Sequence, residues 1–187
     1  MNDVLRTIYA RRSIRAFKNE QIKREDLDAI IEAGLCAPSA NNSQNRHFTV
    51  IQNIEVILKV NNWVLDEIEQ SGNARLHQIA GERRIGNVFG DAPTMIIISV
   101  QQNDRFGAIN AAAATQNILL AAESLGIASC WVGMVSILAI SSNLLSYMRE
   151  LKIPEGYLPQ NGISLGYRAS ESPPAPERKE NLVSYIV

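Results

Sequence analysis

The spacing of apolar and polar positions predicts helices and strands in mixed order along the chain. Apolar residues three or four positions apart predict helices at residues 2–10, 23–35, 54–70 and 137–151. Short apolar or alternating runs predict strands at residues 47–52, 128–132 and 162–165. Because strands and helices do not alternate regularly, the pattern favours an α+β fold over a doubly wound parallel sheet.

Two further segments are apolar on every side. Residues 94–100 follow Pro93 and contain the run Met95–Ile98, which is typical of a strand buried on both faces. Residues 107–125 are rich in alanine and carry little charge, which predicts a buried helix. We expect this helix to lie at the centre of the domain or across a contact between subunits.

The remaining long segments are predicted to lack a buried face. Residues 71–92 are polar and contain four glycines, so we expect an irregular stretch within a variable cover over residues 61–92. Residues 168–187 contain three prolines and are expected to run as an extended arm. Its apolar end, residues 183–187, is a candidate final strand that reaches a neighbouring chain. The 187 residues are interpreted as one domain.

Composition narrows the function classes. A net charge of -1 gives no general attraction to nucleic acid or to an anionic membrane. The N-terminus has no apolar leader, the apolar runs are too short for a membrane span, and a cytoplasmic protein is expected. Cys36 and Cys130 do not have the spacing of a disulfide framework and are expected to be buried thiols.

The common catalytic motifs are absent from the sequence. It has no glycine-rich dinucleotide or phosphate loop and no Gly-x-Ser-x-Gly segment. The two histidines, His47 and His77, lie too far apart for a zinc motif, and no metal site is expected. Chemistry, if present, is therefore assigned to a bound cofactor.

The first candidate binding segment is Arg11-Arg12-Ser13-Ile14-Arg15. Guanidinium groups bind phosphate through paired charge-assisted hydrogen bonds. In an extended backbone, Arg11, Ser13 and Arg15 would share one face and form an anion clamp. On these residues alone, a solvated basic end of the first helix is the favoured interpretation.

The second candidate segment is residues 37–44, Ala-Pro-Ser-Ala-Asn-Asn-Ser-Gln. Small residues permit a flat ligand to approach the backbone, and amide side chains offer a donor and an acceptor to a heterocycle. An ordinary polar turn after a helix is the alternative.

Taken in order, these segments resemble the nitroreductase family of FMN proteins. The family pattern Arg-Arg-Ser-x-Arg-x-Phe is matched at residues 11–17, and Ala-Pro-Ser-x-x-Asn-x-Gln is matched at residues 37–44. Three later segments agree as well: Gly90–Pro93, Ala114–Ala122 and Gly126–Gly133. The resemblance runs from about residue 4 to the C-terminus and favours the binding interpretation of both segments.

The resemblance implies a homodimer of α+β subunits with two FMN sites at the dimer interface. Each subunit would have a central mixed or antiparallel sheet flanked by helices, and a C-terminal extension exchanged between the chains. Arg11, Arg12 and Ser13 would lie at the FMN phosphate, and Arg15 at the N1–O2 edge of the ring. A guanidinium there would stabilise the negative charge of reduced flavin.

The resemblance also implies ring contacts from both chains. The other chain would contribute Pro38, Ser39, Ala40, Asn42 and Gln44. The opposite side of the ring would be lined by Trp131, Val132 and Gly133. Arg178 and Lys179 would return on the C-terminal arm to the phosphate.

The activity implied is electron transfer from NADH or NADPH, through FMN, to nitroaromatic, quinone or related acceptors in a ping-pong scheme. No protein nucleophile or base is required. An FMN-binding protein without useful turnover, and a specialised dehydrogenase or dehalogenase of the family, remain alternatives. A nucleic-acid role is the weakest hypothesis, because no stacking aromatics accompany the arginines.

Some positions depart from the family pattern or have open roles. Asn45-Arg46 stands where the family often has Pro-Trp, and Asn110 stands where it usually has Asp. Further candidates for contacts with FMN or substrate are Asn61, Asn62, Asn73, Trp63 and His77. For Trp63 core packing is favoured, and for His77 a solvated surface position. Gln116 and Asn117 are expected to form hydrogen bonds between helices.

Overall fold

The sheet is built around strand β2, Thr94–Gln101, whose side chains are buried on both faces. The structure, a computed structural model, describes residues 1–82 and 87–187. Within these residues the strands form one antiparallel sheet in the order β1-β2-β4-β3, with β1 at Arg46–Ile51, β3 at Ala128–Val132 and β4 at Tyr157–Gly166. Together with its helices, this sheet confirms the predicted α+β class.

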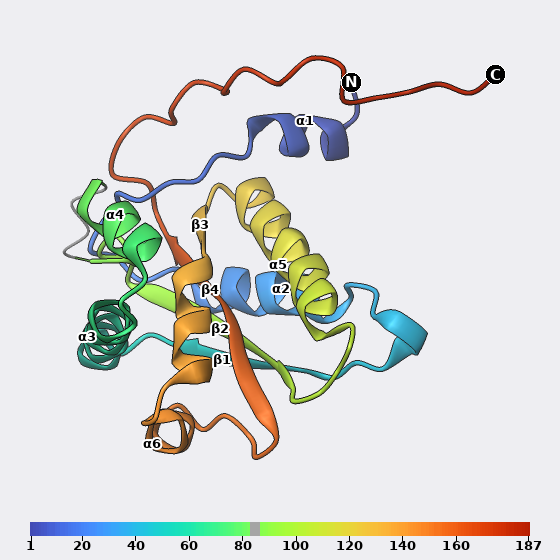
Figure 1. Cartoon of the computed structure of the whole chain (residues 1–187). Coiled ribbons are helices and arrows are strands. Elements are labelled where there is room, and N and C mark those ends of the chain that lie inside the picture. The colour runs from blue at the N-terminus through green and yellow to red at the C-terminus, as the bar shows by residue number, and fades with distance from the viewer. Residues whose placement is uncertain (83–86) are drawn as a thin grey trace.

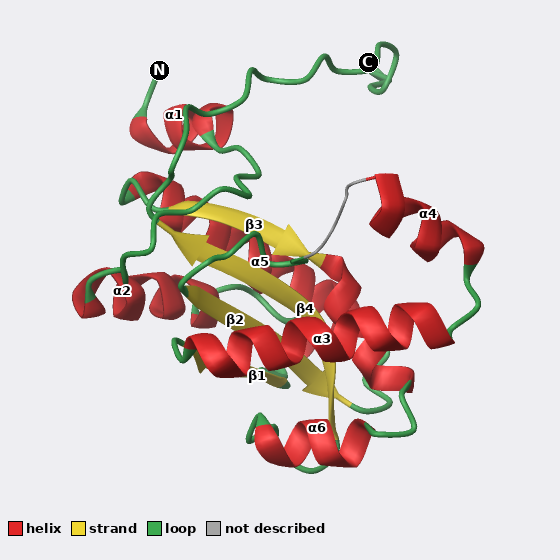
Figure 2. Ribbon diagram, turned by 90° about the vertical axis from the view of Figure 1, so that its left-hand side faces the viewer, coloured by secondary structure: helices red, strands yellow, loops and turns green. Residues whose placement is uncertain are grey.

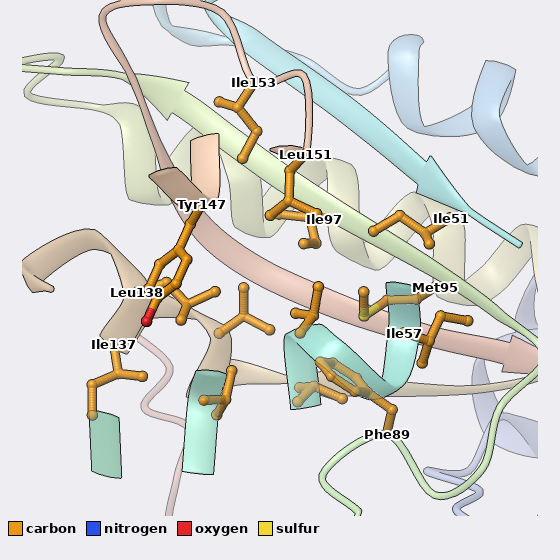
Figure 3. Close-up of a cluster of buried hydrophobic side chains, with 14 of the residues drawn as sticks. Ile51, Ile57, Phe89, Met95, Ile97, Ile137, Leu138, Tyr147, Leu151 and Ile153 are labelled. Atoms are coloured by element: carbon orange, nitrogen blue, oxygen red, sulfur yellow. The ribbon is translucent and has the colours of Figure 1, made fainter. Parts of the chain in front are cut away.

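Helices cover both faces of the sheet (Figure 1). On one face, Met95 and Ile97 of β2 join a cluster with helix α3, Ile54–Gln70, and with the segments η2, Gly133–Ile140, and α6, Leu144–Glu150. Figure 3 shows this cluster, in which Phe89 and Tyr147 fill the space between the sheet and α3.

On the opposite face, the alternate β2 residues Ile96 and Ile98 pack against helices α2, Arg24–Leu35, and α5, Gly107–Ser124. These two helices approach closely because Gly34 leaves space for Ile118, whose side chain would lie 2.8 Å from a Cβ at that position. The amide of Asn117 donates a 2.9 Å hydrogen bond to the Ala33 carbonyl, which confirms the predicted bond between helices for Asn117.

Helix α1, Asp3–Ala10, lies over the C-terminal half of α5 and buries none of its residues in the single chain. Its apolar side, including Val4 and Ile8, is exposed. Parts of α5 are also uncovered, because Ile109 and Gln116 are exposed and several alanines are only half-buried. The expectation that α5 is enclosed on every side is therefore not met within one chain.

The structure corrects the prediction for residues 71–92. Helix α4, Ala74–Glu82, forms there in place of an irregular stretch, and Figure 2 shows it beyond the end of α3. Asn73 begins it by accepting hydrogen bonds from the backbone N–H groups of Arg75 and Leu76. Part of the predicted cover, residues 83–86, lies outside the described residues.

Two other boundaries differ from the predictions. Strand β4 begins at Tyr157, five residues before the predicted start, and includes Pro159 beside a bulge opposite Ile98 and Ser99. A bulge accommodates a residue that lacks an N–H donor. The helix predicted at residues 137–151 is divided into η2 and α6, with the separation at Ser141–Asn143.

The C-terminal arm is extended and exposed, and residues 183–187 form no strand in the single chain. Cys130 is buried as expected, but Cys36 is exposed, because it follows the last residue of α2 and the buried position is taken by Ala37. Among helices of the described residues, none has the length and apolar character needed to cross a membrane.

Candidate functional site

The arginine segment, residues 11–15, leaves α1 in an extended conformation. Arg11 ends the helix with φ -55° and ψ 129°. Ser13 then pairs with Ser129 of β3 in a parallel bridge, and the Ile14 N–H donates a 3.0 Å bond to the Ser129 carbonyl. Ile14 is buried, whereas Ser13 and Arg15 are exposed. The alternation predicted for the anion clamp is therefore present at the edge of the sheet.

The side chains on the outer face of this segment have no partners among the residues that the structure describes. Within the described part of the chain, Arg11, Ser13 and Arg15 form no side-chain hydrogen bond or ion pair. Arg12 differs, because its Nη1 donates to the carbonyls of Tyr9 and Arg11 at 2.7 and 2.8 Å. Arg12 therefore caps the end of α1, and the other three donors are available to an anion.

A turn at residues 87–92 supports the segment from beside it. Gly90 has φ +64°, and a Cβ at this position would lie 2.2 Å from the Arg15 carbonyl oxygen. The turn is tied to α3, because the buried Asn61 accepts a 2.8 Å hydrogen bond from the Val88 N–H. Asn87 also donates a 2.7 Å hydrogen bond to Asp91. These contacts fix the backbone that carries Arg15.

The end of β3 contributes to the same sheet edge. Trp131, Val132 and Gly133 follow Ser129, the residue paired with Ser13. Trp131 is 38% exposed and Gly133 is exposed, whereas Val132 is buried. The exposed indole at this sheet edge offers an apolar surface to a ligand.

The 38–44 loop lies at the N-terminal end of α5, whereas the arginine segment lies beside β3, which follows the C-terminal end of α5. The Ala40 N–H donates a 3.0 Å hydrogen bond to Oδ1 of Asn110, in the first turn of that helix. Ser39 accepts from the Gln44 N–H at 3.0 Å, and Asn42 accepts from the Gln44 amide at 3.2 Å. In Figure 1 this loop, in cyan, is far from the blue segment that follows α1. One chain therefore does not bring the two predicted halves of the site together.

The other candidates have structural contacts or exposed positions. Asn73 caps α4, and Asn62 is exposed and accepts a 3.3 Å hydrogen bond from Asn61. Trp63 stacks on Tyr147 with ring centroids 4.4 Å apart, in agreement with core packing. His77 lies exposed on α4, as expected for a surface residue. The arm residues Arg178 and Lys179 are exposed as well.

The nitroreductase family model matches residues 8–167, which include the arginine segment, the 38–44 loop and the whole sheet.

This chain belongs to the nitroreductase family.

Solved nitroreductases have the same fold over the whole chain. The nitroreductase of Bacteroides fragilis, solved with bound FMN, is 32% identical with a TM-score of 0.91, and the match covers 100% of both chains. The FMN-bound nitroreductase of Desulfitobacterium hafniense is 30% identical with a TM-score of 0.89, covering 100% of this chain and 99% of that one.

A curated relative extends the comparison to a protein named for its activity. This chain is 29% identical over 189 residues to the NAD(P)H FMN reductase of Bacillus subtilis. The match covers 99% of this chain and 74% of that protein. This chain is thus similar both to nitroreductases and to a flavin reductase.

Three residues at the candidate site have contacts that the sequence did not indicate. Gly90 was noted only as part of a family turn, and its positive φ and contact with Arg15 emerge from the structure. Arg46 and Asn110 were noted only as departures from the family pattern, yet both contact the 38–44 loop. Their departure from the pattern was the available signal, but it did not indicate that they are neighbours.

Proposed function

We propose that this protein is a homodimeric FMN-dependent oxidoreductase that passes electrons from NADH or NADPH to nitroaromatic, quinone or related small acceptors. Its family membership and the FMN bound by similar proteins support this proposal. The observation that carries it is the extended face at the sheet edge, formed by the half-buried Arg11 and the exposed Ser13 and Arg15, which fits a phosphate and an electron-rich ring edge.

Arg11 and Ser13 would hold the FMN phosphate, with the guanidinium fork and the hydroxyl as donors. Arg15, two residues further along the same face, would lie at the N1–O2 edge of the ring. Bound FMN would supply the electron transfer itself. The fixed positive charge of Arg15 would stabilise the negative charge that reduced flavin acquires at this edge.

The second half of the site would come from a second copy of the chain. Helix α5 has 18 residues and is therefore about 27 Å long. The 38–44 loop contacts its first turn, whereas the arginine segment lies beyond its C-terminal end. One flavin is too short to contact both in the same chain. A partner related by twofold symmetry would bring its loop to the arginine segment of the first chain.

Exposed apolar surface supports this dimer. Helix α1 presents Val4, Ile8 and Tyr9 to solvent, and the arm presents Leu182 and Ile186. Contiguous apolar surface of this kind is typical of an interface. The arm would cross to the partner, where Arg178 and Lys179 would approach a phosphate, and Trp131–Gly133 would lie on the side of the ring opposite the loop. The donor and the acceptor would then occupy the remaining face in turn.

The visible spectrum of the purified protein, followed by anaerobic addition of NADH, tests this proposal. We expect flavin absorbance that bleaches with NADH and returns when a quinone or nitroaromatic is added. A flavin that binds but does not bleach with NADH or NADPH would identify a flavin-binding protein without turnover. A protein that is colourless and takes up no added FMN would overturn the site.

A further inference from the structure

The 38–44 loop has an uncommon backbone conformation. Asn41, Asn42 and Gln44 have φ values of 55°, 52° and 51°, in the left-handed region that residues other than glycine seldom occupy. Such conformations persist only where the surrounding structure holds them, and they gather at functional sites. Two residues outside the loop hold its first part in place.

The first is Arg46, at the start of β1. Its Nη2 donates to the Ala37 carbonyl at 2.9 Å, and its Nη1 lies 3.3 Å from the Pro38 carbonyl. The same Nη1 reaches the carbonyl of Asn110 at 3.3 Å. The guanidinium is half-buried and forms none of the ion pairs found among the described residues. It therefore places an unneutralised positive charge beneath the loop.

The second residue is Asn110, which is 3% exposed. Its Oδ1 accepts the Ala40 N–H at 3.0 Å, and its Nδ2 lies 3.4 Å from Asp104 Oδ2. Asp104 uses its other oxygen to accept from the Phe106 N–H at 2.8 Å, so its carboxylate faces the helix start and not Arg46. The two departures from the family pattern, Arg46 and Asn110, are thus direct neighbours that hold one backbone segment.

We propose that Arg46 and Asn110 are a pair of positioning residues that fix the backbone of Pro38–Ala40, and that the charge of Arg46 increases the preference of the site for reduced FMN. This inference rests on the proposed function, in which the loop contacts the flavin of the partner chain. The side chain at position 110 faces Asp104, so an aspartate there would bring two carboxylates together, whereas the Asn110 amide donates toward Asp104. The neutral amide also accepts the Ala40 N–H and leaves the charge of Arg46 in place.

The charge of Arg46 acts on both forms of the flavin, but unequally. Reduced flavin is more negative than oxidised flavin, so a nearby cation stabilises the reduced form more. Burial lowers the pKa of Arg46, yet an arginine side chain remains protonated in proteins. The effect is therefore constant over the pH range in which the protein is folded.

Three substitutions separate position from charge. Arg46→Gln removes the charge and the fork, Arg46→Lys keeps the charge and removes the fork, and Asn110→Ala removes the acceptor for Ala40 and keeps the charge of Arg46. Arg24→Gln is the matched control, because Arg24 is exposed at the other end of α2 and pairs with Asp28. For each holoenzyme, the dissociation constant of oxidised FMN and the reduction potential of bound FMN would be measured.

We expect Arg46→Gln to lower the preference for reduced over oxidised FMN by about tenfold. A tenfold change corresponds to about 30 mV for a two-electron couple. Arg46→Lys and Asn110→Ala should keep the preference of the unaltered protein. Both should bind oxidised FMN several-fold more weakly, since a hydrogen bond to the loop is lost in each. Arg24→Gln should change neither quantity.

Two outcomes would overturn the inference while leaving the proposed function intact. One is an Arg46→Gln protein that binds FMN with an unchanged potential. The other is an Arg46→Lys protein that shifts the potential as far as Arg46→Gln does. Absence of FMN binding by the unaltered chain is a different result, because it would contradict the proposed function itself.

Discussion

Gly90 lies directly against the backbone of Arg15. A Cβ at Gly90 would approach the Arg15 carbonyl oxygen to 2.2 Å, and the φ of Gly90 is +64°. The turn before the central strand therefore supports the residue that we place at the flavin ring. No side chain fits at position 90 unless the arginine segment moves.

Replacing Gly90 with alanine should lower the free energy of unfolding by about 2–4 kcal/mol, through left-handed strain and backbone overlap. FMN binding should weaken as Arg15 is displaced. Gly72→Ala is the control, because Gly72 has φ +59° but nothing within 4 Å of its Cβ position. It should cost about 1–2 kcal/mol from strain alone and leave FMN affinity unchanged. Thermal denaturation measures the loss of stability, and flavin titration measures the loss of FMN affinity. Equal losses in the two variants would contradict the contact between Gly90 and Arg15.

Removing the proposed phosphate donors should affect FMN but not riboflavin, which lacks the phosphate. The double variant Arg11→Gln, Ser13→Ala should bind FMN about 10–100-fold more weakly, because hydrogen bonds to a charged group are lost. Its affinity for riboflavin should equal that of the unaltered protein. Arg6→Gln, on the exposed side of α1, is the control for charge. A parallel loss of riboflavin affinity would place these residues away from the phosphate.

Mixed dimers test whether each site uses two chains. One chain would carry Arg11→Gln and Ser13→Ala, and the other Ala40→Phe, which fills the surface offered to the ring. Each variant alone should bind FMN weakly. A mixed dimer should regain one tight site, formed by the unaltered arginine segment of one chain and the unaltered loop of the other. Flavin titration of tagged, purified heterodimers gives the number of tight FMN sites. A mixed dimer without a tight site would indicate that each site lies within a single chain.

Adjacent serines should contribute differently to stability. Ser141 donates to Oε1 of Glu67, which also accepts from Tyr147 at 3.0 Å, and these bonds join η2 and α6 to α3. Ser141→Ala should cost about 1.5–3 kcal/mol, as expected for a hydrogen bond to a charged group. Ser142→Ala, at an exposed position, should change stability by less than about 0.5 kcal/mol. Urea denaturation of both variants measures the free energy of unfolding. Similar losses in the two variants would contradict the role of Glu67.

His47 should make stability depend on pH on the acidic side of neutrality. Partial burial lowers its pKa from 6.5 in the folded protein, so the unfolded chain binds the proton more readily. The free energy of unfolding should therefore decrease as the pH falls below 6.5, until the pKa of folded His47 is passed. His47→Gln should flatten this part of the profile. An identical slope in both proteins between pH 7.5 and about 5 would rule out His47 as its source.

Much of the fold could be predicted because apolar periodicity determined the burial of its main elements. Residues 54–70 form α3 as predicted, and the run Met95–Ile98 is buried on both faces because helices cover both. Helix α4 was missed because glycines at its margins suggested irregularity, although Asn73 was a visible helix cap. The start of β4 was missed because Pro159 lowers strand propensity, and only the bulge opposite Ser99 explains its position.

The candidate site was predictable where side chains alternate along an extended backbone. It was less predictable where residues far apart in the sequence come into contact. The period of two placed Ser13 and Arg15 on one exposed face, as the structure has them. Sequence could not place Gly90 against Arg15, nor Arg46 beside Asn110, since these pairs are separated by 75 and 64 positions and meet only through the sheet and α5. Exposure of Cys36 was also missed, because its apolar neighbour Leu35 is itself exposed and the buried position is that of Ala37.

The separation of the 38–44 loop from the arginine segment by the length of α5 has a thermodynamic consequence. In a site divided between two copies, cofactor retention and subunit association are a single linked equilibrium. Dilution that dissociates the subunits would release the flavin, and excess FMN would hold the subunits together. The protein would then be coloured when concentrated and lose its colour on dilution, with no change in any residue of the site.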